Sequence, residues 1–283
     1  MNLAGGKTEL EKCPYVSEEA REKLAAESAP PIRPLTIGAG DYAVKVGGET
    51  VLFRHEKTFV NPPGLAAVVS TNEDEASVNG KMDRFKACQY DRVGLKLRAQ
   101  MFLVEDGSGD PAAFPALAGK VSNGTGASII LKSDRVDSLK AAALELKDKK
   151  PLLYAATAAN ADALGELAKQ AACPLVVKGD GNLDSVIALT EKLTGMGLKD
   201  LVIDTGSREL KKVFEEQILI RRAALKDRFR PLGFPTLIMA NEMASDIMDE
   251  TLVAATFIAK YGAVIVMSDF QPHTLFPLFL ERL

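Results

Sequence analysis

The segment LLYAATAANADALGELAKQAACPLVVKGD, residues 152–180, contains one complete strand–helix–strand unit. It begins with the apolar run Leu152–Ala155 and ends with a second run, Leu175–Val177. Between them, Asn160 or Asp162 can cap an amphipathic helix, because a side-chain oxygen there accepts a hydrogen bond from the first helical turn. Both runs are continuously apolar, which is typical of parallel strands buried on both faces. We therefore predict parallel strands joined by helices.

The same unit recurs from Leu65 to the end of the chain. Eight such parallel strands favour a closed (β/α)8 TIM barrel, because closure leaves no edge strand. The length of 283 residues fits one barrel of about 250 residues with a short leader. An open doubly wound sheet is the alternative, but no Gly-x-Gly-x-x-Gly motif follows any strand. The eight apolar runs are Leu65–Val69, Met101–Val104, Ser128–Leu131, Leu152–Ala155, Leu175–Val177, Leu201–Ile203, Thr236–Met239 and Ala263–Met267.

The N-terminal part of the chain has a different pattern. Residues 1–34 form a polar, helix-prone leader followed by a proline-rich linker, which we expect to be extended because proline removes backbone donors. Residues 35–64 contain short apolar runs separated by glycines, the last of them Thr50–Phe53. We predict a small β-meander that caps the N-terminal end of the barrel. Residues 65–283 then form the barrel itself.

The composition limits the classes of function. Apolar residues make up 47% of the chain, enough for a large core, and the net charge of −3 provides no basic surface for nucleic acid. No apolar run approaches the roughly 18 residues of a membrane span, and the N-terminus lacks a secretory signal. The three dispersed cysteines, Cys13, Cys88 and Cys173, suit a reducing compartment. We expect a cytoplasmic protein with no nucleic-acid or membrane partner.

Polar side chains directly after the eight runs are the candidates for chemistry, because barrel active sites form at the C-terminal ends of the strands. Such a rim suits general acid–base catalysis or the binding of a polar heterocycle. The same residue types also serve as helix N-caps in any barrel, and we favour that simpler interpretation. The rim residues are Ser70, Thr71, Asn72, Glu105, Asp106, Lys132, Ser133, Thr157, Asn160, Lys178, Asp180, Asp204, Ser207, Asn241, Glu242, Ser268 and Asp269.

Two specific chemistries can be assigned to this rim. Asp204, Asn241 and Asp269 are candidates for holding a pterin ring, which presents adjacent donors and acceptors. Lys132 and Lys178 end apolar strands and suggest a Schiff-base aldolase, which needs a lysine with a depressed pKa. Nearby carboxylates oppose that, because they favour the charged form of lysine.

Metal and thiol chemistry have little support in the sequence. Neither His55 nor His273 has a second histidine or cysteine at ligand spacing, so we do not expect a zinc site. Cys88 lies in a predicted helix and Cys173 just before a predicted strand. We interpret both as small buried side chains and not as nucleophiles.

Several segments resemble one protein family across essentially the whole chain. They are Cys13-Pro14, Ala29-Pro30-Pro31, the stretch LFRHEKTF at Leu52–Phe59, LIMANE at Leu237–Glu242, and Met267-Ser268-Asp269. Together they resemble the large (gamma) subunit of the corrinoid/iron–sulfur protein of acetyl-CoA decarbonylase/synthase systems.

The resemblance implies a three-part subunit with an iron–sulfur module, a barrel and a C-terminal corrinoid domain. It implies a small (delta) barrel subunit, a methyltransferase and acetyl-CoA synthase as partners. The family carries a methyl group on cobalt between a methyl-tetrahydropterin and the nickel centre of acetyl-CoA synthase, in the reductive acetyl-CoA (Wood–Ljungdahl) pathway.

Cys13 matches the fourth ligand of the family's [4Fe–4S] cluster, which needs four thiolates. The three preceding cysteines and the corrinoid domain are missing from this sequence. We therefore expect residues 1–34 to be a remnant of the iron–sulfur module, in a fragment or a natural partial gene product that binds neither cofactor. The barrel would act as a scaffold and docking domain, and a pterin-dependent methyltransferase barrel is the alternative.

Overall fold

The computed structural model describes most of the chain outside its N-terminal leader. The predicted leader helix, Cys13 and His55 lie outside the described part. Within that part, no helix is long and apolar enough to cross a membrane. The described residues are 17, 29–53, 56 and 59–283.

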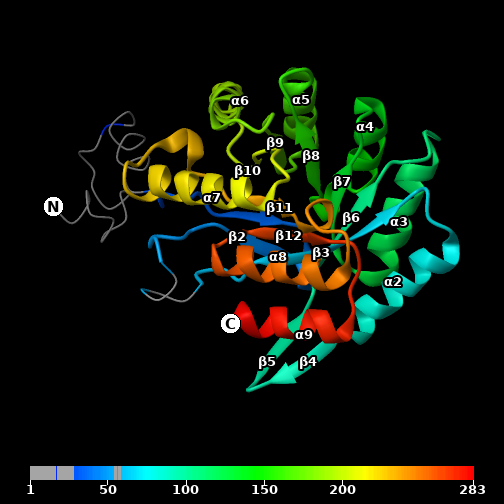
Figure 1. Ribbon diagram of the computed structural model, residues 1–283. Helices are drawn as coiled ribbons and strands as arrows, with labels where there is room; N and C mark the ends of the chain where they lie inside the picture. The colour runs from blue at the N-terminus through cyan, green and yellow to red at the C-terminus, as the bar shows by residue number, and fades with distance from the viewer. Residues whose placement is uncertain (1–16, 18–28, 54–55, 57–58) are drawn as a thin grey trace.

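Eight parallel strands form one sheet at the centre of the molecule (Figure 1). A parallel bridge between Ile203 and Thr236 brings the two outer strands together, so the sheet closes as a barrel. Each predicted apolar run overlaps one of these strands, and the barrel prediction is confirmed. In sheet order the strands are β10 (Leu201–Asp204), β9 (Leu175–Lys178), β8 (Leu152–Ala156), β7 (Ser128–Lys132), β6 (Met101–Glu105), β3 (Gly64–Ser70), β12 (Val264–Met267) and β11 (Leu237–Met239).

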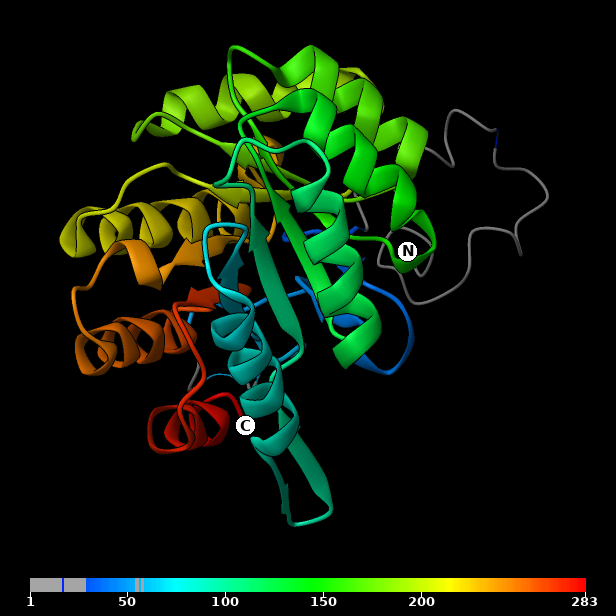
Figure 2. The same cartoon turned by 90° about the vertical axis from the view of Figure 1, so that its right-hand side faces the viewer.

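Helices surround the barrel and alternate with its strands (Figure 2). The helix that starts at Leu183 follows Asn182, whose side chain accepts a hydrogen bond from the backbone N–H of Asp184. The α-helices are α2 (Glu75–Ala87), α3 (Ala113–Thr125), α4 (Val136–Glu145), α5 (Ala161–Ala171), α6 (Leu183–Gly195), α7 (Leu210–Leu225), α8 (Ile247–Ala259) and α9 (Pro272–Glu281), and the 3-10 turns are η2 (Gly40–Tyr42), η4 (Lys147–Lys149), η5 (Arg230–Leu232) and η6 (Ala240–Glu242).

The core has two layers, because successive strand residues point to opposite faces. On β6, Phe102 and Val104 pack in the layer between strands and helices, whereas Met101 and Leu103 fill the barrel interior. All four side chains are fully buried. This two-sided burial explains why the strands read as continuous apolar runs.

An N-terminal hairpin packs against the barrel interior where the strands begin. Its strands, β1 (Leu35–Ile37) and β2 (Val44–Val46), pair antiparallel and share an apolar cluster with interior barrel residues. Ser128 at the start of β7 donates a hydrogen bond to the carbonyl of Tyr42 at 2.6 Å.

The predicted third strand of the meander, Thr50–Phe53, is not a strand. Gly47 and Gly48 both have positive φ, of 80° and 85°, and turn the chain away from the hairpin. The carbonyl of Val51 then accepts a hydrogen bond from Arg221 on α7 and not from a neighbouring strand.

A second hairpin was not predicted. Strands β4 (Gln89–Arg92) and β5 (Leu95–Arg98) pair antiparallel between α2 and β6 and project from the barrel (Figure 2). The turn between them contains Val93 and Gly94, both with positive φ. Most of the hairpin is exposed, so its strands are rich in polar residues and contain no apolar run that would indicate a buried strand.

Candidate functional site

A chain of ion pairs crosses the mouth of the barrel at the C-terminal ends of the strands. The ammonium of Lys132 on β7 lies 2.8 Å from Glu105 on β6 and 2.8 Å from Glu242 on η6. Glu242 also accepts a hydrogen bond from Arg208, which pairs in turn with Asp204 on β10 at 2.9 Å. The mouth therefore contains carboxylates and cations that neutralise one another.

Tyr154 on β8 lies at the centre of this network. Its hydroxyl donates to Asp204 at 2.7 Å and accepts from Arg208 at 3.1 Å. The ammonium groups of Lys132 and Lys178 are each 5.8 Å from the centroid of its ring. Burial, with the negative charge of Asp204, raises the pKa of Tyr154 far above its usual value. The phenol therefore remains a neutral hydrogen-bond donor.

The ion pairs hold both partners in their charged forms. Burial alone would raise the pKa of Glu242, but hydrogen bonds from Lys132 and Arg208 outweigh burial and lower it. Burial would lower the pKa of Lys132, yet Glu105 and Glu242 raise it. A Schiff-base lysine must be neutral to attack a carbonyl, so the raised pKa of Lys132 opposes the aldolase hypothesis.

The three proposed pterin ligands have different surroundings. Asp204 lies in the network, whereas Asp269 pairs with Arg84 on α2 at 2.6 Å. Asn241 adjoins Glu242 on η6, and its side-chain oxygen is buried without a hydrogen-bond partner among the described residues.

Several other rim residues hydrogen-bond within the loops at the barrel mouth or to the helices that follow. The side chain of Asn160 accepts from the backbone N–H of Thr157 at 2.7 Å, and Ser207 donates to Glu216 at 2.9 Å. Asp106 accepts from Ser133 and from Arg135, each at 2.7 Å, and these bonds lower its pKa although burial alone would raise it. The interpretation of these residues as helix N-caps was wrong: the side chains that cap the described helices are those of Asp74, Asn182 and Asp246, and the side chain of Asn160 makes no cap bond.

Two residues of the network, Tyr154 and Arg208, were not among the rim residues predicted from the sequence. Tyr154 was counted as one more apolar strand residue, although it is the only residue of its run with a polar group that can reach a partner. Arg208 lies in the loop after β10, four residues beyond Asp204, and only the path of that loop brings it back over the mouth.

The described residues do not fit an iron–sulfur cluster. Cys88 ends α2 and Cys173 precedes β9; both are buried, as predicted, and burial raises the pKa of Cys173 to about 11. A [4Fe–4S] cluster needs four thiolates, and no group of three or more potential metal ligands occurs in the described part. Asp204 and Arg208 also line a cavity of about 10 Å³, the room of one water molecule, between β10, β11 and α7.

These features define a (β/α)8 barrel whose mouth is crossed by a chain of ion pairs. The chain belongs to the family described as CO dehydrogenase/acetyl-CoA synthase delta subunit, whose model matches residues 34–282.

Two relatives illustrate its place in that family. The chain is 41% identical over 282 residues to the corrinoid/iron–sulfur protein large subunit of Moorella thermoacetica, covering 100% of this chain and 63% of the relative. It is 29% identical over 284 residues to the acetyl-CoA decarbonylase/synthase complex subunit gamma of Methanothermobacter thermautotrophicus, covering 96% and 62%. The predicted family resemblance is confirmed, and the chain spans a little under two thirds of these relatives.

Solved structures show the same fold at low sequence identity. Dihydropteroate synthase from Thermus thermophilus is 13% identical with a TM-score of 0.59, over 87% of this chain and 97% of that protein. The phospho-2-dehydro-3-deoxyheptonate aldolase of Thermotoga maritima is 12% identical with a TM-score of 0.56, over 96% and 76%. At this identity the similarity concerns the barrel fold alone.

Proposed function

We propose that this chain is the barrel of a corrinoid/iron–sulfur methyl-carrier large subunit and acts as a scaffold and subunit-docking domain. The full carrier would take part in cytoplasmic methyl transfer between a methyl-tetrahydropterin and acetyl-CoA synthase, paired with a small (delta) subunit. The names of the relatives, a corrinoid/iron–sulfur protein and a subunit of an acetyl-CoA decarbonylase/synthase complex, support this role. Residues 1–34 would belong to the iron–sulfur module, 35–64 to the cap and 65–283 to the barrel.

The main observation that supports the scaffold role is that the charged groups at the mouth form ion pairs with one another. A catalytic barrel needs room for a substrate and groups ready to bind it. Here Glu242 is engaged by Lys132 and Arg208, and Arg208 also engages Asp204. A substrate would have to break these ion pairs and compensate for the buried charges it leaves behind.

The alternative, a pterin-dependent methyltransferase barrel, has one observation in its favour. The side-chain oxygen of Asn241 is buried and lacks a hydrogen-bond donor among the described residues, and a pterin N–H could supply one. It requires the neighbouring ion pairs of Glu242 with Lys132 and Arg208 to rearrange around the bound ring.

Two binding measurements separate the two functions. We expect the chain to form a stable complex with the small subunit in gel filtration, and methyl-tetrahydropterin to give no binding heat with the chain alone. Tight pterin binding that Asn241→Leu abolishes, while Asn123→Leu on the exposed face of α3 leaves it intact, would establish the methyltransferase alternative instead. Failure to bind the small subunit would contradict the docking role.

A further assay concerns Lys178, the mouth lysine that makes no ion pair with any described residue. Under the scaffold proposal, borohydride reduction with small aldehydes or ketones traps no adduct at this residue. A stoichiometric adduct that disappears in Lys178→Met, but persists in Lys199→Met at an exposed site, would support an aldolase. Metal analysis of the purified chain should find neither iron nor cobalt in stoichiometric amount.

A further inference from the structure

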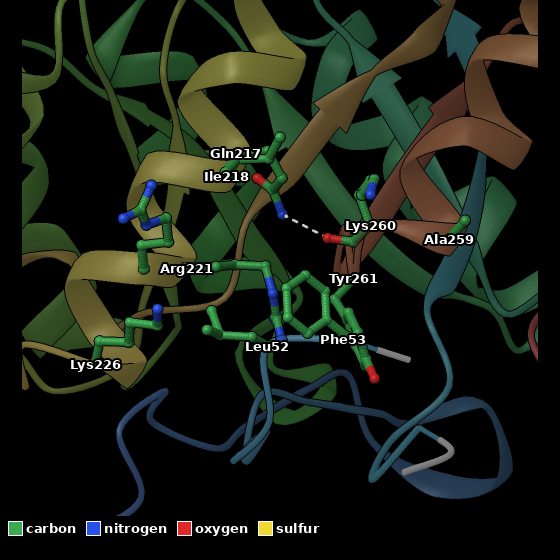
Figure 3. Close-up of a pocket in the computed structure, with 10 residues that line it drawn as sticks. Leu52, Phe53, Gln217, Ile218, Arg221, Lys226, Ala259, Lys260 and Tyr261 are labelled. Carbon is green, nitrogen blue, oxygen red and sulfur yellow. Dashed lines mark hydrogen bonds between the residues drawn. The ribbon is translucent and has the colours of Figure 1, made fainter. Parts of the chain in front are cut away.

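A cavity of about 620 Å³ opens at the end of the barrel opposite to the mouth (Figure 3). It lies where α7 and α8 end and where Tyr261 leads into β12. Leu52 and Ile218 contribute apolar walls beside the ring of Tyr261. The volume is within the range of small-molecule sites, about 300–1,000 Å³.

One wall of this cavity is formed by Arg221, a buried arginine that is only partly compensated. Its side chain is 5% exposed, its guanidinium stacks 4.0 Å from the ring centroid of Tyr261, and it donates to the carbonyl of Val51. Its Nε atom is buried and has no hydrogen-bond partner among the described residues. A buried guanidinium with an unused donor gains from an anion placed within hydrogen-bond distance.

Glu49 is a counter-charge of Arg221, but it makes no hydrogen bond to the Nε of Arg221. Glu49 is buried, one of its oxygens has no partner, and it makes no ion pair with Arg221 among the described residues. Burial raises the pKa of Glu49 although Arg221 lowers it. Glu49 therefore leaves the Nε–H of Arg221 without an acceptor among the described residues.

Three further cations surround the cavity, and no carboxylate of the described residues lines it. Arg222 and Lys226 are exposed, and neither forms an ion pair within the described part of the chain. Lys260 lies 5.1 Å from the ring centroid of Phe214. Cations near helix C-termini also balance the helix dipole, which accounts for Lys226 and Lys260 but not for the unpartnered Nε of Arg221.

We propose that this cavity binds a small organic anion. Its anionic group would pair with Arg221, Arg222 and Lys226, and its apolar body would pack against Leu52, Ile218 and Tyr261. The site is separate from the barrel mouth, and it stands whether or not the scaffold role does.

A matched pair of dyes tests the proposal on the 283-residue chain. 8-Anilinonaphthalene-1-sulfonate carries an anionic group on an aromatic body, and N-phenyl-1-naphthylamine is the same body without the charge. We expect one sulfonate dye to bind per chain, with much weaker binding of the neutral dye and an affinity that falls with added salt. Because the chain has no tryptophan, Phe214→Trp places a single indole on α7 beside Lys260, and energy transfer from it reports that the dye is bound to the chain.

The decisive variant removes two exposed cations and leaves the core intact. Arg222→Met/Lys226→Met should weaken the sulfonate dye about tenfold or more. Lys199→Met/Lys211→Met removes the same charge from exposed positions outside the cavity and should change affinity little. Equal affinity for the two dyes, no energy transfer from the introduced indole, or the same weakening in both double variants would overturn the proposal.

Discussion

At the scale of single residues, Glu242 shows how the mouth is closed. Its carboxylate receives Lys132 from β7 and Arg208 from the loop after β10, two segments that meet only across the barrel. Burial alone would disfavour its charge, so the two cations must outweigh that cost. Removal of the carboxylate leaves two partly buried cations with fewer partners.

We predict that Glu242→Gln destabilises the chain by about 1–2 kcal/mol at pH 7. The pKa of Glu242 is lowered in the folded state, so its stabilising effect is present above the unfolded value of about 4.3 and is lost as pH falls through the folded value. The difference between variant and parent should shrink below about pH 4. Urea unfolding at pH 7 and near pH 3.5 measures both effects.

Glu215→Gln is the matched control, because Glu215 is exposed on α7 without an ion pair among the described residues. It should be neutral at both pH values. Equal stability of Glu242→Gln and the parent at pH 7 would show that the ion pairs contribute nothing net.

Gly38 provides a second prediction at this scale. It has a φ of 82°, and an added Cβ would lie 1.7 Å from the hydroxyl of Ser128. Gly38→Ala should cost about 2–4 kcal/mol, because it combines backbone strain with a clash that displaces the N-terminal hairpin. Gly40→Ala has a similar φ of 69° and nothing within 4 Å of the added atom, so it should cost only about 1 kcal/mol. Thermal unfolding of both variants measures the difference, and equal losses would exclude the clash.

At the scale of elements, the β4–β5 hairpin has an unfavourable turn. Val93 is 93% exposed and has a φ of 49°, followed by Gly94 with a φ of 77°. Two consecutive positive φ values are typical of a type I′ turn, which prefers Asn-Gly, whereas a β-branched residue is strained there.

We predict that Val93→Asn stabilises the chain by about 0.5–1 kcal/mol, because asparagine tolerates positive φ and valine does not. Chemical denaturation provides the measurement. Leu95→Asn removes another exposed apolar side chain outside the turn and should not stabilise. A gain in both variants would point to the loss of exposed apolar area and not to the turn.

At the scale of the whole molecule, the number of backbone pairings between neighbouring strands differs around the barrel. Strands β3 and β6 pair through the register Ala66–Met101 to Ser70–Glu105, whereas β10 and β11 meet at the single bridge Ile203–Thr236. Strands β10 and β11 therefore share few backbone hydrogen bonds, and we call this junction the seam. Side chains must help to hold the seam closed, among them Gln217, which donates to Thr236 at 2.8 Å.

Native-state hydrogen exchange should therefore be faster at this seam. The amide of Ile203, which donates to Pro235, should open with a free energy lower by about 1–2 kcal/mol than amides between β3 and β6. Mass spectrometry or NMR under native conditions measures both sets. Equal protection would mean that the barrel opens only as one cooperative unit.

The alternation of apolar runs and amphipathic segments predicted the barrel well, because each strand is buried on both faces and each helix on one. Runs such as Leu152–Ala155 and Leu175–Val177 carry that burial in their own composition. The pattern failed where burial is not periodic: at Thr50–Phe53, where Gly47 and Gly48 redirect the chain, and at the exposed β4–β5 hairpin.

Local patterns in the sequence were enough to predict the barrel strands, their alternation with helices and several of the residues near the mouth, since these follow from periodicity and strand ends. The roles of those residues became visible only in the folded chain. Lys132 contacts Glu242 across 110 positions of sequence, and Tyr154 contacts Asp204 across 50. Such pairings depend on barrel closure and loop paths, which no local pattern encodes. The same closure made Arg221 a buried cation facing a cavity, although its sequence neighbours suggest only an ordinary helix end.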